Sequence, residues 1–134
     1  MVVVDTNILA YLLISGDRTR EARRLYEHDP EWRSEAFLLI EFSNLLATYV
    51  RLDRLSHAKS EKVLEEAESR IHGLVRLPHL QVLRVAHRFK VSAYDARFLA
   101  AAETLKTKLV TEDAKLRAAA PGRTQFLAEA LDAD

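Results

Sequence analysis

The chain opens with MVVVDTN at residues 1–7. Met1 to Val4 form an apolar run, which is typical of a strand buried on both faces of a parallel sheet. The run stops at Asp5, Thr6 and Asn7, before apolar residues resume. Two interpretations of Asp5 are open. It either caps a following helix, because Asp, Thr and Asn are all good N-cap residues, or it belongs to an active site at the end of the strand.

Length and composition predict one compact domain over residues 1–134. The 134 residues are 49% apolar and 30% charged, which is ordinary for a globular protein. A chain of this length buries roughly two-thirds of its extended surface. Three Gly and three Pro leave little room for linkers, and the lack of Cys excludes disulfides, thiolate zinc sites and a thiol nucleophile. We therefore expect a cytoplasmic protein.

Charge and hydropathy narrow the choice of partners. No apolar run approaches the ~20 residues that span a bilayer, and the first residues lack the basic leader of a signal peptide, so we expect no membrane partner. Twenty Lys and Arg balance twenty Asp and Glu, which argues against a generally basic nucleic-acid binder. Most of the cations are Arg, whose planar fork suits phosphate contacts if the arginines cluster in space.

Apolar periodicity predicts an alternation of strands and helices. Strands are expected at 1–4, 31–35, 72–78 and 108–113, with an edge strand at TQFLA (124–128). Helices are expected at 8–14, 18–28, 36–52, 56–71, 79–90, 92–105 and from 114 through 120. This alternation indicates a parallel sheet with helices on both faces. We predict an α/β fold, a three-layer α/β/α sandwich with a central, mostly parallel sheet.

Two carboxylates follow predicted strands. Asp5 ends the first strand and Asp113 ends the strand within KLVTED (108–113). Ligands of an open parallel sheet bind outside the carboxyl ends of its strands. Either residue alone is more simply a cap or a loop residue, but together they indicate a site at one edge of the sheet.

Two further carboxylates lie on apolar helix stripes. Glu41 shares a stripe with Leu38 and Phe42, and burying it unpaired would cost several kcal/mol, so it either pairs with an arginine or belongs to a site. Asp95 begins a stripe that continues at Phe98, and it also fits an S-x-x-D capping pattern with Ser92. Capping and metal ligation are compatible at Asp95, because the helix dipole favours an ionised carboxylate there.

Four converging acids need a counter-charge. Mg²⁺ or Mn²⁺ accepts carboxylate and water ligands, and such a site supports metal-assisted hydrolysis of phosphodiesters. We expect Asp5, Asp95 and Asp113 to ligate the metal, with Glu41 ligating it directly, through water, or orienting the nucleophile.

Other polar residues have simpler interpretations. The five histidines show no i, i+4 pair and are expected at the surface. Glu112 should point away from Asp113 and is the weaker candidate ligand. Arg97, on a different helix face from Asp95, is expected to be structural.

Four segments resemble the motif blocks of PIN-domain proteins, especially VapC-type toxins. They are VVVDTNILAYLL (2–13), LIEFSNLL (39–46), SAYDARFLAAAETL (92–105) and LVTEDAKLRAAA (109–120). The resemblance implies an α/β/α sandwich and a Mg²⁺- or Mn²⁺-dependent ribonuclease that acts on RNA. It also implies a homodimer and inhibition by a VapB-type antitoxin.

The family's acidic quartet corresponds to Asp5, Glu41, Asp95 and Asp113. Thr111 matches a polar residue that supports the last acid. Thr6 and Asn7 would hold the loop that carries Asp5.

The sequence departs from the family at two turns. Arg88, Phe89 and Lys90 stand where a Gly is usual before the third block, and Lys106 and Thr107 replace a Gly after the following helix. These departures affect turn geometry and leave the acids in place.

The leading hypothesis is a metal-dependent endoribonuclease of the toxin type. The alternative is a non-catalytic PIN-like interaction module. A phosphotransfer enzyme using Asp5 is less favoured, because Asn7 breaks the D-x-D pattern and Glu41 and Asp95 would have no role.

Overall fold

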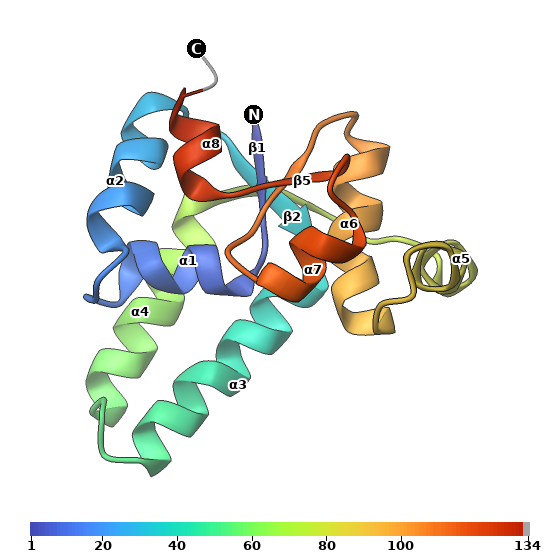
Figure 1. Ribbon diagram of the computed structural model, residues 1–134. Coiled ribbons are helices and arrows are strands. Elements are labelled where there is room, and N and C mark those ends of the chain that lie inside the picture. Colours follow the sequence, from blue (N-terminus) through green and yellow to red (C-terminus); the bar gives the residue numbers. More distant parts are fainter. Residues whose placement is uncertain (133–134) are drawn as a thin grey trace.

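A five-stranded sheet forms the centre of the computed structural model, which describes residues 1–132 (Figure 1). Its strand order is β3-β2-β1-β4-β5, and every pairing is parallel. The strands are β1 (Val2–Val4), β2 (Trp32–Glu35), β3 (Ile71–Val75), β4 (Leu109–Val110) and β5 (Thr124–Gln125). The first strand is therefore central, as its uninterrupted valines predict.

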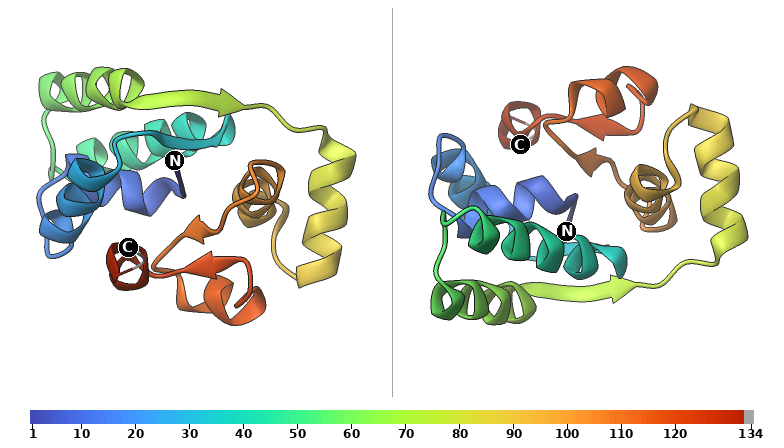
Figure 2. Two further views of the ribbon diagram at one scale, coloured as in Figure 1. Left: turned by 90° about the horizontal axis from the view of Figure 1, so that it is seen from above. Right: turned by 90° about the horizontal axis from the view of Figure 1, so that it is seen from below.

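Helices cover both faces of the sheet. Helix α6 packs across β1, β2 and β4, and α5 lies against α6; α1, α3 and α4 pack together on the other side (Figure 2). Helix α2 contacts α1 and α8. The helices are α1 (Thr6–Leu13), α2 (Thr19–His28), α3 (Phe37–Arg51), α4 (His57–Arg70), α5 (His79–Phe89), α6 (Ala93–Thr104), α7 (Ala114–Ala119) and α8 (Leu127–Asp132). The predicted three-layer α/β/α class is confirmed. Within residues 1–132, no helix is long and apolar enough to cross a membrane.

The strand order reverses its direction at β1. From β1 the chain builds outward through β2 to β3, then returns through α5 and α6 to place β4 on the other side of β1. In doubly wound sheets, the crevice outside the carboxyl ends of the two strands at such a switch point is the usual ligand site. Here those strand ends lead directly to Asp5 and Thr111.

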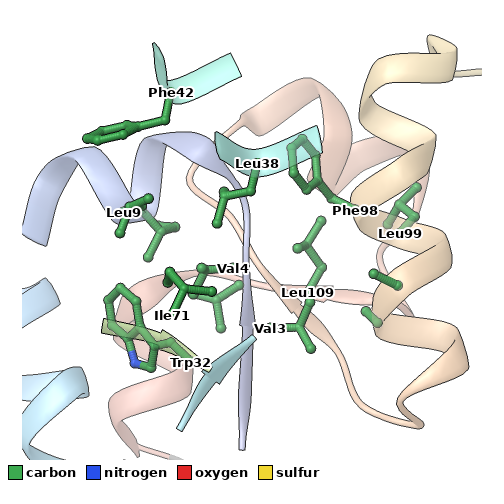
Figure 3. Packing of buried hydrophobic residues seen from close by; sticks show 14 of the residues in the cluster. Val3, Val4, Leu9, Trp32, Leu38, Phe42, Ile71, Phe98, Leu99 and Leu109 are labelled. Atoms are coloured by element: carbon green, nitrogen blue, oxygen red, sulfur yellow. The ribbon is translucent and has the colours of Figure 1, made fainter. Parts of the chain in front are cut away.

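Large apolar side chains fix the sheet between its helices. Val3, Val4 and Leu109 are completely buried, and Trp32 and Phe42 are equally inaccessible to solvent (Figure 3). Truncating a buried aromatic residue of this size to Ala typically costs about 3–5 kcal/mol. The backbone positions at the carboxyl ends of the strands are therefore held by a rigid core.

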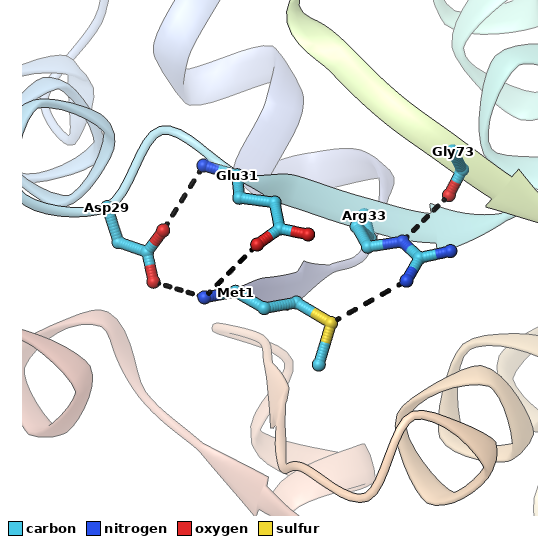
Figure 4. Close-up of polar contacts among 5 residues, drawn as sticks. All are labelled: Met1, Asp29, Glu31, Arg33 and Gly73. Atoms are coloured by element: carbon cyan, nitrogen blue, oxygen red, sulfur yellow. Dashed lines mark hydrogen bonds and ion pairs between the residues drawn. The ribbon is translucent and has the colours of Figure 1, made fainter.

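Polar contacts occupy the opposite edge, at the amino ends of β1 and β2 and beside β3. The amino group of Met1 pairs with Asp29 and lies 3.9 Å from Glu31 Oε1, while Arg33 Nε donates to the carbonyl of Gly73 at 3.2 Å (Figure 4). At this edge cations and anions neutralise one another. In contrast, acidic residues such as Asp5 and Asp113 lie at the edge formed by the carboxyl ends of the strands.

Several boundaries differ from the sequence prediction, including that of the third strand, which spans Ile71–Val75 instead of 72–78. Helix α1 begins at Thr6, so Thr6 and Asn7 are helical rather than in a loop. Strand β4 ends at Val110, and the predicted edge strand TQFLA forms a ladder only at Thr124–Gln125.

Helix α8 takes the place of the rest of that edge strand. The backbone N–H of Phe126 donates to Glu129 Oε1 at 2.9 Å, and that of Leu127 donates to Glu112 Oε2 at 2.7 Å. These carboxylates bind the free N–H groups of a helix start. Strand β5 cannot extend further, because its neighbour β4 has only two residues with which to pair.

Candidate metal centre

Asp5 both ends β1 and caps α1. Its backbone is extended (φ −92°, ψ 179°), and its Oδ1 accepts a hydrogen bond from the Ile8 N–H at 3.2 Å. Its Oδ2 accepts from the Thr111 hydroxyl, and the residue is only 7% exposed. Asp5 is the N-cap of α1, so the capping interpretation of this residue is confirmed.

Thr111 connects the ends of the two central strands. It is completely buried, its hydroxyl donates to Asp5, and the same oxygen accepts from the Asp113 N–H at 3.1 Å. Asp113 in turn caps α7, with Oδ1 accepting from the N–H groups of Lys115 (2.9 Å) and Leu116 (3.2 Å). One hydroxyl thus holds together the two loops that carry Asp5 and Asp113.

Glu41 enters from α3 and is half-buried. Its Oε1 accepts a hydrogen bond from the Thr6 hydroxyl on α1. No arginine within residues 1–132 forms an ion pair with it, so the ion-pair interpretation is wrong. Leu38 and Phe42 on the same helix are fully buried, whereas Glu41 lies at the rim of the core, where a carboxylate retains partial hydration.

Asp95 enters from the first turn of α6. The Ser92 Oγ accepts from the Asp95 N–H at 3.0 Å, which confirms the predicted cap. The Asp95 carboxylate is half-buried rather than part of the core. A helix N-terminus favours negative charge there.

The carboxylates influence one another electrostatically. Burial raises the pKa of Asp5 to about 7, opposed by the hydrogen bonds from Thr111 and Ile8 and reinforced by the charges of Asp95 and Asp113. Burial also raises the pKa of Asp95, with further contributions from the charges of Asp113 and Glu41. All four predicted acids therefore belong to one electrostatic cluster at the switch point of the sheet.

The donor set of this acid cluster (Asp5, Glu41, Asp95 and Asp113) suits a hard divalent cation. It consists of carboxylate oxygens, the ligands that Mg²⁺ and Mn²⁺ prefer, and raised carboxyl pKa values mark sites where a cation would relieve repulsion. Within residues 1–132, no three Asp, Glu, His or Cys side chains are already arranged to hold an ion.

The neighbouring residues Asn7 and Glu112 play different parts. Asn7 is exposed, and its side chain forms no hydrogen bond within residues 1–132; it lines a cavity of about 340 Å³ with Tyr11, Arg18 and Tyr49, so its side chain does not hold Asp5. Glu112 pairs with Arg18 at 2.9 Å and accepts from Leu127, which leaves it a structural role.

Sequence reasoning missed Glu35, a buried acid at the end of β2. It is 2% exposed, and its carboxylate accepts from the Phe37 N–H at 2.6 Å and from Arg97 Nη1 at 3.2 Å. The structural role predicted for Arg97 is confirmed. The available signal was the position of Glu35 at the end of a strand, which it shares with Asp5.

The two turns that lack glycine keep a glycine-like backbone. Lys90 and Lys106 have φ values of 57° and 60°. This left-handed conformation costs a non-glycine residue roughly 1–2 kcal/mol. The departures from the usual sequence thus preserve the turn geometry at a local cost.

The fold and the acid cluster together define an α/β protein with a carboxylate-lined site at the switch point of a parallel sheet. A family model for the PIN domain matches residues 2–121. The chain belongs to the PIN domain family.

Named relatives agree with this assignment. The chain is 28% identical over 118 residues to "Ribonuclease VapC3" of Pyrobaculum aerophilum, covering 85% of this chain and 90% of that protein. A crystal structure of PAE2754 from the same organism superposes with a TM-score of 0.80 at 24% identity, covering 98% of this chain and 93% of the other.

Two further solved structures share the fold at lower similarity. A toxin–antitoxin complex from Klebsiella pneumoniae has a TM-score of 0.65 at 22% identity, covering 95% of this chain and 98% of that one. A structure of FitAB bound to an IR36 DNA fragment has a TM-score of 0.66 at 16% identity, covering 95% of each chain. At these identities, the solved structures establish the fold alone.

Proposed function

We propose that this chain is a VapC-like endoribonuclease that depends on Mg²⁺ or Mn²⁺. The observation that carries the proposal is the single electrostatic cluster of Asp5, Glu41, Asp95 and Asp113 at the switch point of the sheet. The similarity to a protein named as a ribonuclease supports RNA as the substrate class.

Each residue has a defined part in this proposal. Asp5, Asp95 and Asp113 hold the cation, and Glu41 either joins them or orients the attacking water. A bound divalent cation supplies activation of water and stabilisation of charge on the phosphate. Thr111 holds the Asp5 carboxylate through its hydroxyl, and Thr6 does the same for Glu41.

The proposal includes a VapB-type antitoxin as partner. The cavity lined by Asn7, Tyr11, Arg18 and Tyr49 adjoins α1, the helix that Asp5 caps, and offers aromatic and amide groups to a peptide. The toxin–antitoxin complex among the structures of the same fold supports this choice.

A homodimer and a cytoplasmic location are also part of the proposal. Leu80 and Leu83 on α5 are 57% and 46% exposed, which supports an apolar subunit contact on that helix. The cysteine-free composition suits a reducing compartment.

RNA cleavage provides the direct test. Wild type, Asp5→Asn, Asp95→Asn and the exposed control Asp53→Asn are incubated with RNA and Mg²⁺ or Mn²⁺, with and without EDTA. We expect cleavage by wild type and Asp53→Asn only, and only with metal. Equal activity in all four proteins would refute the assignment.

Calorimetric titration with Mn²⁺ separates the enzyme from the alternative, a non-catalytic PIN-like interaction module. The enzyme is expected to bind Mn²⁺ in a manner that Asp95→Asn abolishes. A folded wild-type chain without measurable Mn²⁺ affinity would favour the interaction module.

A further inference from the structure

A cavity of about 620 Å³ lies beside the acid cluster and takes no part in the function proposed above. Its walls come from the end of β2, the start of α3, the loop between β3 and α5, and the start of α6. Two of its lining residues are sequence neighbours of the acids: Ile40 precedes Glu41, and Tyr94 precedes Asp95. Phe37, one helical turn before Glu41, lies on the same face of α3 as that acid.

A pair of aromatic rings, an exposed Tyr94 and a partly buried Phe37, forms one wall. The rings of Phe37 and Tyr94 are stacked, with centroids 5.4 Å apart and planes 15° apart. Tyr94 is 64% exposed and Ile40 is 65% exposed. Exposed aromatic rings of this kind are the usual stacking surface for unpaired nucleic-acid bases.

The cavity also contains one uncommitted cation. Arg97 is occupied, since it pairs with Glu35 and contacts His79 Nδ1 at 2.8 Å. Arg76 is exposed and has no hydrogen bond or ion pair within residues 1–132. A flat apolar platform next to a free guanidinium is complementary to a nucleotide, which has a flat base and an anionic phosphate.

We propose that this cavity binds an unpaired base of single-stranded RNA adjacent to the scissile phosphate. The base stacks on Tyr94, and a neighbouring backbone phosphate pairs with Arg76. This inference rests on the proposed ribonuclease function and adds to it a subsite that holds the nucleotide next to the cut. Continuity with Glu41 and Asp95 favours RNA over a protein partner, because a bound strand would extend from the acids directly into the cavity.

Kinetics on short oligoribonucleotides test the platform. The substrates are single-stranded and differ in one base beside the cleavage site; the proteins are wild type, Tyr94→Phe, Tyr94→Ala and the control Leu52→Ala. Leu52 is also exposed (56%), but it lies at the far end of α3. We expect Tyr94→Ala to lose about 5-fold or more in kcat/KM, the lower end of the cost of losing one stacked base. Tyr94→Phe keeps the ring and should retain activity, and the base preference should weaken only in Tyr94→Ala.

Binding supplies a readout that does not depend on cleavage. In the Asp95→Asn background, an oligoribonucleotide with 2-aminopurine at the flanking position should lose fluorescence on binding, and Tyr94→Ala should restore it. Arg76→Gln should weaken binding similarly for all sequences and reduce the salt dependence by about one phosphate contact.

The outcomes separate the two proposals. Unchanged kcat/KM, base preference and fluorescence in Tyr94→Ala would overturn the subsite. A change of molar mass by light scattering in Tyr94→Ala, with RNA binding unchanged, would also overturn it and assign the cavity to contact with a second copy of the chain. If wild type cleaves no RNA while the fluorescence change still depends on Tyr94, the ribonuclease proposal fails and the base-binding site stands.

Discussion

Replacing Asp5 by Asn should stabilise the metal-free protein, although it removes a residue central to the proposed activity. The pKa of Asp5 is 3.8 in a model peptide and about 7 in the folded chain. Between these values the folded state binds a proton that the unfolded state has released, so stability falls as pH rises. The difference of about 3 pKa units corresponds to about 4 kcal/mol, fully expressed above pH 7.

The amide that Asp5→Asn introduces keeps the useful contacts without the charge. Its oxygen can still accept from the Ile8 N–H, and its NH₂ group can donate to the Thr111 hydroxyl. In EDTA we therefore expect Asp5→Asn to exceed wild type in free energy of unfolding by about 4 kcal/mol at pH 8, and by only about 2 kcal/mol at pH 5.

Urea unfolding followed by circular dichroism, at pH 5, 6.5 and 8 in EDTA, measures this difference. Asp53→Asn is the matched control, because Asp53 is exposed and its φ of 57° is one that Asn tolerates. Its stability should match wild type within about 0.5 kcal/mol. If Asp5→Asn is less stable than wild type by the same amount at every pH, the carboxylate is ionised and satisfied, and the reasoning fails.

Metal should narrow the difference in stability between wild type and Asp5→Asn. At pH 8, Mn²⁺ at about 100 times its dissociation constant should stabilise wild type by about 2.7 kcal/mol. Asp5→Asn should gain much less, because one proposed ligand has lost its charge. Equal stabilisation of both proteins would show that Asp5 does not hold the cation.

Two further substitutions test the supports of the site. Ser92→Ala removes the acceptor of the Asp95 N–H and should lower the free energy of unfolding by about 1 kcal/mol, measured by urea unfolding. Arg97→Met leaves the Glu35 carboxylate bonded only to the Phe37 N–H and should cost about 3–5 kcal/mol. The double variant with Glu35→Gln should recover part of that loss, and a double variant as unstable as Arg97→Met alone would contradict the buried-charge explanation.

Much of the fold was predictable because its signals are local. The valines before Asp5 indicated a doubly covered strand, and the alternation of strand and helix patterns indicated the parallel sheet. The length of β4 and the presence of α8 were not predictable. At the start of α8, Glu129 accepts a hydrogen bond from the Phe126 N–H and Glu112 accepts one from the Leu127 N–H. The contact between Glu112 and Leu127 joins residues 15 positions apart, so it forms only when the chain has folded.

The acids were predictable individually, but their partners were not. Asp5 and Asp113 were predicted because each follows a predicted strand. Glu41 and Asp95 were predicted because each places a carboxylate on an otherwise apolar helix stripe. Which of them ligate a metal stays a prediction. The same reasoning missed Glu35, because the buried partner that neutralises it, Arg97, is distant in the sequence.

The sequence by itself determined that β1 ends in a carboxylate at the edge of a parallel sheet where ligands bind. It could do so because an apolar run and the polar residues that end it are local features of the sequence. Only the tertiary structure decided what that carboxylate contacts. Thr111 reaches Asp5 across 106 positions of the chain, and Thr6 reaches Glu41 across 35. Such pairings, and the burial that raises the pKa of Asp5, exist only when the strand order has brought β4 beside β1 and the helices have removed water from their ends.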